Sequence, residues 1–396
     1  MSVVVGLPLA AEPVASPLLP APALTPRLEA DPFDAGLWAR AEAWSTGTPF
    51  QRLDWVRAHA EAFAADEGFE PRLVSLRDRT GEVAGLVPLA VGRRAGLRVA
   101  AIAGGRHASF HMPVLAEDAL LSPGDLTRIG RLVGADAVLL SGLPRAWAGR
   151  PNPLAAGAPP SPSNAYELAL LADGEATLRA ALSADKRKKL RQKERYLAEI
   201  GPVRHLIAGS AAEIDRLLAA FLAQKADRFA ELGITDPFAG EAAQAFLRRA
   251  CLAGLERGRP AMELHGLLAG ERVVAVFGAA VDGGRSAGMV ISFDADPGIA
   301  RCSPGDLLLA RVIADSCAKG RSRFDLGVGE ARYKASFCPT AIELVDVAAA
   351  VTWRGRAYLA ATARGRAAKR WIKSNPRAWK AVSMARRLRA ALPSRP

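Results

Sequence analysis

The chain has 396 residues, 50% of them hydrophobic, which is enough for two or three domains with sizeable cores. No apolar run approaches the roughly 20 residues that cross a bilayer, so the sequence excludes a helical membrane span. The four cysteines form no C-x-x-C pair. We therefore expect reduced thiols in the cytoplasm, with neither a disulfide framework nor a metal site.

The net charge of +13 is located in the C-terminal tail. Residues 353–396 contain 13 of the 53 Lys and Arg residues and no Asp or Glu. The remaining 40 basic residues equal the 40 acidic ones, so residues 1–352 are neutral. Tryptophans among these charges predict a helical tail in peripheral contact with an anionic inner membrane. A solvated tail and a partner-docking helix remain alternatives, and nucleic acid is disfavoured because no recognition motif accompanies the charge.

The first half of the chain predicts a leader and one α/β unit. Residues 1–29 are rich in Pro and Ala, and the first basic residue is Arg27, so we expect a disordered leader and not a signal peptide. Residues 30–149 predict helices between Asp34 and Ala65, three strands, a helix from Pro123 to Val133, and the strand "AVLLSGLP". Residues 150–164, rich in Pro, Gly and Ser, predict a linker.

Residues 165–352 repeat this plan. The strand "YELALL" precedes a basic helix from about Leu178 to Glu199 and helices at about 211–232 and 240–257. Three strands follow, then a helix from Pro304 to Lys319, the strand "SRFDLGV", and "TAIELVDVAAAVTW". The repeat indicates an α/β (α+β) fold of two similar units, each a mixed sheet flanked by helices.

The stretch "CSPGD" predicts a well-capped helix start. Ser303 stands at the N-cap, Pro304 at the first helical position, and Asp306 at the third, which completes a capping box. Gly305 permits a close approach to the backbone. Free amides at such an end attract a phosphate or a carboxylate, although Asp306 already supplies a negative charge there.

A basic helix is predicted around "SADKRKKLRQKERYLAEIG", with seven Lys and Arg residues between Lys186 and Arg195. This excess of one sign fits contact with an anionic ligand, such as a cofactor phosphate or a lipid-linked sugar phosphate. An ordinary charged outer face explains it equally well.

The stretch "FDLGVGEARYKASF", 324–337, predicts a strand, a glycine corner and a cluster of polar side chains. Asp325 is expected on the face of the strand opposite its neighbours, and Gly327 and Gly329 allow a tight exit. Tyr333 could donate a proton to a leaving group, and Lys334 could pair with an anion. His265, on another strand, predicts a core or edge residue and not a catalytic base.

These motifs resemble the GNAT-like proteins of bacterial cellulose and exopolysaccharide clusters, the CelD/BcsL type, over roughly residues 165–350. The matching motifs are a basic R-x-x-x-R helix, a Y-SPG-x-L helix start, and D-[FL]-x-x-G-x-x-x-Y-K. The matching residues are Arg187 and Arg191, then Ser303, Pro304 and Gly305, then Asp325, Gly329, Tyr333 and Lys334. The sequence departs from the pyrophosphate loop of ordinary GNAT enzymes, because Pro304 and Asp306 stand where that loop has glycine or alanine.

The resemblance implies a tandem GNAT-like fold related to the FemAB-type aminoacyl transferases. It implies transfer of an acyl group, such as acetyl, from acyl-CoA to a sugar hydroxyl or amine in cell-envelope, exopolysaccharide or cellulose biosynthesis, without a metal. We assign the predicted site residues by role. Tyr333, Lys334 and Asp325 are expected to be catalytic; Ser303, Gly305, Asp306 and Gly329 to bind the cofactor; and Arg187, Arg191 and Glu330 to bind substrate.

Two alternatives remain open. The first is an aminoacyl transferase that uses charged tRNA, in which the basic helix would bind RNA. The second is a non-catalytic scaffold of a polysaccharide synthase, with the tail docking it to the membrane or to a synthase subunit.

Overall fold

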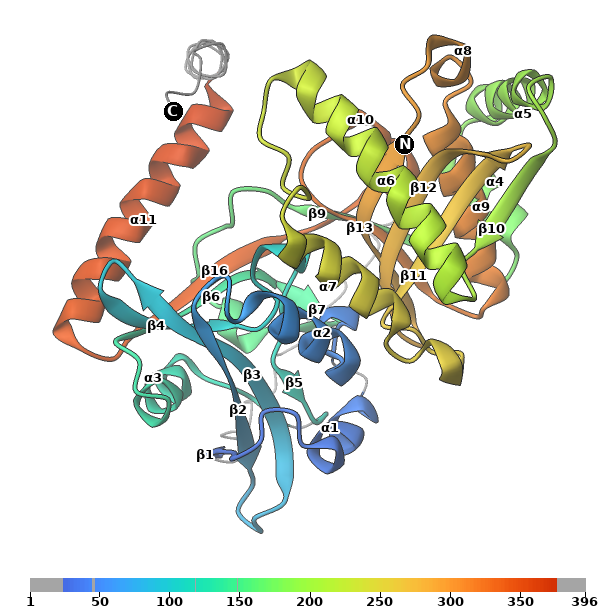
Figure 1. Cartoon of the computed structure of the whole chain (residues 1–396). Coiled ribbons are helices and arrows are strands. Elements are labelled where there is room, and N and C mark those ends of the chain that lie inside the picture. Colours follow the sequence, from blue (N-terminus) through green and yellow to red (C-terminus); the bar gives the residue numbers. More distant parts are fainter. Residues whose placement is uncertain (1–23, 45–46, 118, 148, 376–396) are drawn as a thin grey trace, which may run out of the picture.

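The computed structural model describes residues 24–44, 47–117, 119–147 and 149–375 (Figure 1). Most of the predicted leader lies outside these ranges. Its last residues do not belong to a leader, because Thr25–Leu28 form strand β1, which pairs antiparallel with β2 of the N-terminal sheet.

The N-terminal sheet has the strand order β1-β2-β3-β4-β6-β16, with β5 paired to β3. After β1, its strands are β2 Phe69–Arg77, β3 Val83–Arg94, β4 Leu97–Ile102, β5 Val114–Leu115, β6 Ala137–Pro144 and β16 Leu344–Ala350. Its helices are α1 Ala35–Glu42, α2 Leu53–Phe63 and α3 Pro123–Leu132, with the short η1 Pro49–Gln51 and η2 Gly105–His107. Apolar side chains of α1 and α2 cover one face of the sheet, and those of α3 cover the other.

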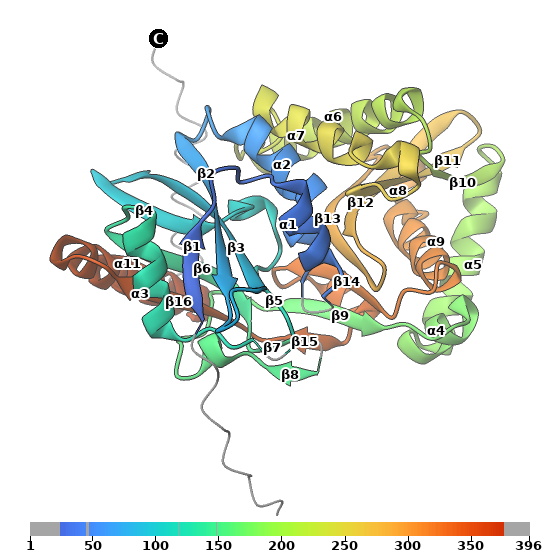
Figure 2. The same ribbon diagram turned by 90° about the horizontal axis from the view of Figure 1, so that it is seen from below.

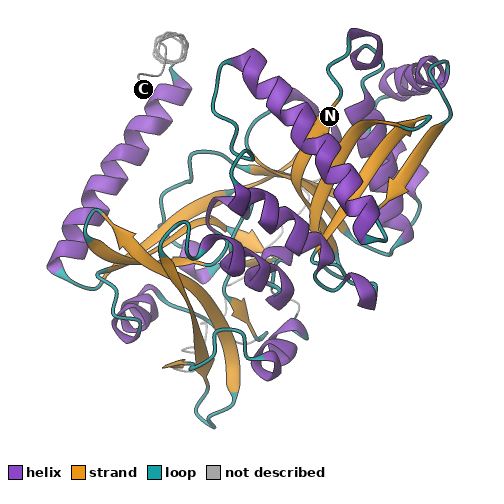
Figure 3. Ribbon diagram, in the orientation of Figure 1, coloured by secondary structure: helices purple, strands orange, loops and turns teal. Residues whose placement is uncertain are grey.

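The C-terminal sheet has the strand order β10-β11-β12-β13-β14-β9-β15. Its strands are β9 Ala165–Ala169, β10 Val203–Ile207, β11 Met262–Ala269, β12 Arg272–Val281, β13 Arg285–Phe293, β14 Arg323–Val328 and β15 Thr340–Ile342. Its helices are α4 Gly174–Ala181, α5 Ala184–Ala198, α6 Ala211–Leu232, α7 Glu241–Leu252, α8 Pro297–Ala300, α9 Pro304–Ala318 and α10 Arg332–Phe337, with η4 Leu255–Arg257. Helices α6 and α7 pack on one face and α9 on the other (Figure 3).

The two halves share one plan, as the repeat in the sequence predicts. In each, a hairpin (β2–β3 or β11–β12) is followed by a third antiparallel strand (β4 or β13), a helix (α3 or α9), and a strand (β6 or β14) parallel to the third. In the C-terminal half, β13 and β14 are paired only from Arg285 to Ala287, near their starts.

The predicted C-terminal unit, residues 165–352, wrongly includes β16. This strand leaves the C-terminal half and pairs antiparallel with β6, so it completes the N-terminal sheet. The predicted linker is also partly structured. It contains β8 Arg150–Pro151, which pairs with β7 Ala146–Trp147, and η3 Pro153–Ala155, whose Leu154 is buried. A return strand of this kind joins the halves through the backbone.

The predicted basic helix is two helices. Leu182 is buried between them, and the hydroxyl of Ser183 accepts a hydrogen bond from the Lys186 amide at 3.2 Å, which starts α5 as a new helix.

Side chains also join the two halves. Helix α2 packs against α7 (Figure 2). At this contact Trp55 and His59 meet Phe246, with ring centroids 5.3 and 5.6 Å apart. Arg52, which precedes α2, donates to the carbonyl oxygen of Val281 at 2.6 Å. The halves therefore form one body with a shared apolar core.

No helix in the described ranges combines the length and the apolar character needed to cross a membrane. The tail begins with helix α11, Trp353–Ser374, and residues 376–396 lie outside the described ranges. All four cysteines are free and buried, and burial raises the pKa of the Cys251 thiol to about 12.

Candidate functional site

A cavity of about 600 Å³ lies beyond the end of β13. Its walls come from α6, the last residues of β13, the start of α9, and α10. The lining residues are Gln224, Lys225, Arg228, Glu231, Ile291, Ser292, Phe293, Ala295, Ala300, Ser303, Pro304, Gly305, Asp306, Leu309 and Tyr333. Four of the predicted site residues are thus brought to one place, although the α9 start and Tyr333 lie about 30 positions apart in the sequence.

The start of α9 differs from its predicted form. Ser303 has φ 49° and ψ 57°, and its side chain does not cap the helix, so the predicted capping box with Asp306 is absent. The Ser303 carbonyl oxygen accepts the amides of Asp306 at 3.0 Å and Leu307 at 3.2 Å, and Pro304 has no N–H. The amides of Asp306 and Leu307 are therefore already paired and are not available to an anion. A left-handed serine costs about 1–3 kcal/mol and is typical of functional sites.

Two lysines of α5 supply positive charge at this helix start. Lys193 Nζ donates to the Ser303 hydroxyl at 2.5 Å, and Lys186 Nζ lies 3.8 Å from an Asp306 carboxylate oxygen. Lys186 also donates to the Ser336 hydroxyl at 2.6 Å. It lies 4.0 Å from the ring centroid of Phe337, and burial lowers its pKa. The α5 helix therefore connects α9 to α10 through lysines.

The opposite wall of the cavity is α6. Burial lowers the pKa of the Lys225 ammonium group, and Arg228 forms an ion pair with Glu231 at 3.0 Å. Gln224 donates to the carbonyl oxygen of Val273 at 2.9 Å and accepts the Ser292 hydroxyl at 2.7 Å. These bonds hold the α6 side chains against the sheet.

Tyr333 and Lys334 have different surroundings, although they are neighbours in α10. Tyr333 lines the cavity, and burial raises the pKa of its phenol, so it stays protonated at neutral pH. Lys334 is not among the lining residues. Its Nζ donates to the carbonyl oxygens of Val328 at 2.9 Å and Gly327 at 3.4 Å, which places it on the glycine corner as a structural contact.

Asp325 is fully buried, outside the cavity lining, and its neighbours Phe324 and Leu326 are buried too. It accepts the Gly327 amide at 3.0 Å and a hydrogen bond from Arg285 at 3.2 Å. Burial raises the pKa of its carboxyl to about 6, although Arg285 opposes the rise. The structure therefore places the predicted catalytic Asp325 inside an ion-pair network, away from the cavity.

The remaining predicted site residues also lie outside this lining. Arg187 donates to the carbonyl oxygens of Leu182 at 2.5 Å and Arg179 at 3.1 Å, so it caps the end of α4. Arg191 and Glu330 are exposed. Gly329 has φ 107° and donates its amide to the Asn164 carbonyl oxygen at 3.0 Å, which makes it a turn residue.

The sequence contained a signal for the lysines that the prediction missed. Lys186, Leu190, Lys193 and Leu197 follow the spacing i, i+4, i+7, i+11, so they share one helix face. Both leucines are buried against the core, and this face turns the two lysines toward α9. Lys225 and Arg228 offered no comparable signal, because Asp227 and Glu231 stand among them and mix the charges as on an ordinary solvated helix.

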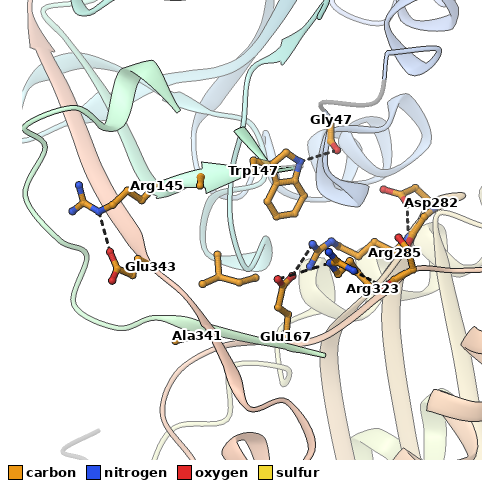
Figure 4. Close-up of a pocket in the computed structure, with 14 residues that line it drawn as sticks. Gly47, Arg145, Trp147, Glu167, Asp282, Arg285, Arg323, Ala341 and Glu343 are labelled. Atoms are coloured by element: carbon orange, nitrogen blue, oxygen red, sulfur yellow. Dashed lines mark hydrogen bonds and ion pairs between the residues drawn. The ribbon is translucent and has the colours of Figure 1, made fainter. Parts of the chain in front are cut away.

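A second cavity, of about 760 Å³, lies between the two halves at the starts of β13 and β14 (Figure 4). Arg285 and Glu167 of the C-terminal half line it together with Trp147 of the N-terminal half. Arg145 and Glu343 form an ion pair at 3.0 Å on its rim. The first cavity lies at the opposite end of β13, so the two are separate sites.

Glu263, His265 and Asp315 place potential metal-ligand atoms within 4.8 Å of one another. Arg321 and Lys319 already bond to the Glu263 carboxylate, and Lys319 also lies 2.8 Å from Asp315. The carboxylates are thus neutralised by protein cations, and we assign the cluster to the core. His265 is fully buried, as predicted for a core residue.

Comparison with known proteins identifies the C-terminal half. Residues 184–335 match the family model described as acetyltransferase (GNAT) domain. The structure is similar to the crystal structure of FemX, with TM-score 0.58 and 9% identity over 85% of this chain and 99% of that chain. It is also similar to a conserved protein of unknown function from Bacteroides thetaiotaomicron VPI-5482, with TM-score 0.52 and 10% identity over 82% of this chain and 99% of that chain.

A search of the curated proteins gave no match. At these identities the two structures establish the fold alone, whereas the family match identifies the domain that carries the first cavity. The chain therefore has a tandem GNAT-like fold, in which residues 184–335 match the acetyltransferase (GNAT) domain, and this match supports an acyltransferase enzyme.

Proposed function

We propose that the protein transfers an acyl group, such as acetyl, from acyl-CoA to a hydroxyl or amine of a sugar used in cell-envelope polysaccharide synthesis. The choice of acyl-CoA as donor rests on the cavity at the start of α9, which is lined by the cations Lys225 and Arg228 and by the protonated phenol of Tyr333. The choice of a sugar as acceptor rests on the resemblance of the motifs to the CelD/BcsL type of exopolysaccharide and cellulose clusters.

The cavity suits a donor that carries phosphates. Lys225 and Arg228 line one wall, and Lys193 is bonded to Ser303 on the other. Ammonium and guanidinium groups form strong charge-assisted hydrogen bonds to phosphate oxygens. The side-chain cations therefore compensate for the amides that the Ser303 carbonyl oxygen has taken at the helix start.

Tyr333 suits the role of general acid in acyl transfer. The acceptor oxygen or nitrogen would form a bond to the acyl carbonyl carbon, and the carbon–sulfur bond would break. The leaving thiolate needs a proton, which Tyr333 holds because burial raises the pKa of its phenol. The acceptor proton would pass to water, and solvent would restore the proton of Tyr333.

An aminoacyl transferase that uses charged tRNA is the second candidate. It is favoured by α5, where Lys188 and Arg191 are exposed and Lys193 is bonded to Ser303 of the cavity wall. Such a donor would present phosphates to the same cations, so the two candidates differ in the size of the ligand and not in the kind of contact.

Binding and turnover measurements separate these candidates. Calorimetry with acetyl-CoA, CoA and tRNA should show acetyl-CoA binding that Lys225→Met weakens roughly tenfold or more, because a charge-assisted hydrogen bond contributes about 1.5–3 kcal/mol. Arg94→Met, an exposed substitution in the other half, is the matched control and should bind as the wild type does. Tight binding of tRNA without acetyl-CoA binding would favour the second candidate. No binding of either donor would contradict both.

A further inference from the structure

Helix α11 presents two tryptophans on one outward side. Trp353 is 80% exposed and Trp371 is 61% exposed, which is unusual for the largest apolar side chain. They are 18 residues apart, which is five helical turns, so they lie on the same side about 27 Å apart along the axis.

The opposite side of α11 is held against the N-terminal sheet. Gly355 is buried so close to the Asp136 carbonyl oxygen that a Cβ there would lie 1.8 Å from it. Tyr358 and Leu359 pack against buried apolar residues of β4 and β6. The Thr352 hydroxyl caps the helix and also donates to Asp136 at 2.8 Å. These contacts fix which side of α11 faces outward, and the helix then extends away from the body (Figure 1).

The outward side is basic and otherwise made of small residues. Arg364, eleven residues after Trp353, lies on nearly the same side, and Arg356 lies within about 60° of it. Both arginines are exposed, and Ala360 and Ala368 between the tryptophans are exposed too. Residues 353–396 contain no Asp or Glu, so nothing in this segment offsets the charge.

We propose that the outward side of α11, defined by Trp353, Arg356, Ala360, Arg364 and Trp371, lies flat on an anionic bilayer surface. Tryptophan rings favour the headgroup region, where one part of the ring is apolar and the other is wet. The alanines let the helix approach the surface closely, and the arginines are attracted to anionic lipids. The phosphate backbone of a nucleic acid would pair with the arginines but would leave the tryptophan rings in water. A bilayer surface therefore fits this side better than a nucleic acid does. This inference goes beyond the proposed function, because it concerns where the enzyme works.

Vesicle flotation of the full chain tests this proposal. Vesicles of phosphatidylcholine with phosphatidylglycerol should carry the protein to the top of the gradient, and vesicles of phosphatidylcholine alone should not. Added salt should reduce the bound fraction. R356E/R364E should lower the partition coefficient at least about tenfold, given about 1 kcal/mol for each basic residue near such a surface. W353S/W371S should lower it severalfold, and W353F/W371F should recover part of the loss.

The controls separate α11 from the other basic segments. K188E/R195E reverses two exposed charges on α5, in the other half of the molecule, and should float as the wild type does. Tyr333→Phe should also float normally, so failure of the acyltransferase proposal would leave this result intact. Equal binding to neutral vesicles would overturn the proposal, as would unchanged binding by folded R356E/R364E and W353S/W371S, or binding of tRNA with no vesicle binding.

Discussion

The guanidinium carbon of Arg285 lies 4.3 Å from the ring centroid of Trp147 (Figure 4). Arg285 begins β13 in the C-terminal half, whereas Trp147 ends β7 in the N-terminal half. The same guanidinium donates to Asp325 at 3.2 Å and to Glu167 at 2.8 Å. One side chain therefore contacts the other half and forms ion pairs with two carboxylates.

Replacing Arg285 with methionine should lower the free energy of unfolding by about 3 kcal/mol or more, because it leaves the buried Asp325 without its cation. Arg323→Met is the matched control in the same cavity. Its side chain is 46% exposed and lies 4.0 Å from Glu167, so its loss should cost less than about 1 kcal/mol. Urea unfolding measures both, and equal losses would contradict the assigned role of Arg285.

The neighbours Tyr333 and Lys334 should respond differently to substitution. Tyr333→Phe removes the proposed proton donor, so kcat should fall roughly 100-fold with little change in melting temperature. Lys334→Met removes the bonds to the Val328 and Gly327 carbonyl oxygens, so unfolding free energy should fall by about 1–2 kcal/mol while kcat changes little. Parallel turnover and melting measurements check this, and a folded but inactive Lys334→Met would return Lys334 to the catalytic set.

Asp325 should make the stability of the protein depend on pH. Its folded pKa is about 6, above the ordinary value of 3.8, because burial disfavours the charged carboxylate. Between about pH 4 and pH 6, the folded state holds a proton that the unfolded state has lost. The contribution of Asp325 to stability therefore falls as pH rises through this range. Asp325→Asn should remove that slope in urea unfolding series, and an unchanged slope would show that another group causes it.

His59 should act in the opposite direction. Burial lowers its pKa from 6.5 to about 3, so below about pH 6.5 the unfolded state takes up a proton that the folded state does not. Stability from this residue is present above pH 6.5 and is lost as pH falls. His59→Phe keeps a ring stacked on Trp55. Between pH 7 and pH 5, the free energy of unfolding of this variant should fall by about 2 kcal/mol less than that of the wild type. An equal loss in the variant would exclude His59 as the source.

Much of the fold could be predicted from local patterns. Two apolar runs joined by a turn indicated the β11–β12 hairpin, and Pro304 at the first helical position indicated the start of α9, because each signal needs only neighbouring residues. The positions of the side chains around the first cavity could not be predicted from such local patterns. Arg187 and Lys186 are adjacent in one basic run, yet Arg187 caps α4 and Lys186 reaches Asp306. A difference of one residue turns a helical side chain by about 100°.

The sequence by itself determined the repeat of two α/β units, the concentration of positive charge after residue 352, and the succession of a strand, a glycine corner and Tyr333. Only the tertiary structure decided that β16 returns to the N-terminal sheet, that Ser303 takes a left-handed conformation bonded to Lys193, and that Asp325 is enclosed with Arg285. Secondary structure follows short-range periodicity. Strand exchange and buried ion pairs depend instead on contacts between residues far apart in the chain, whose favourable energy exists only once both halves are packed.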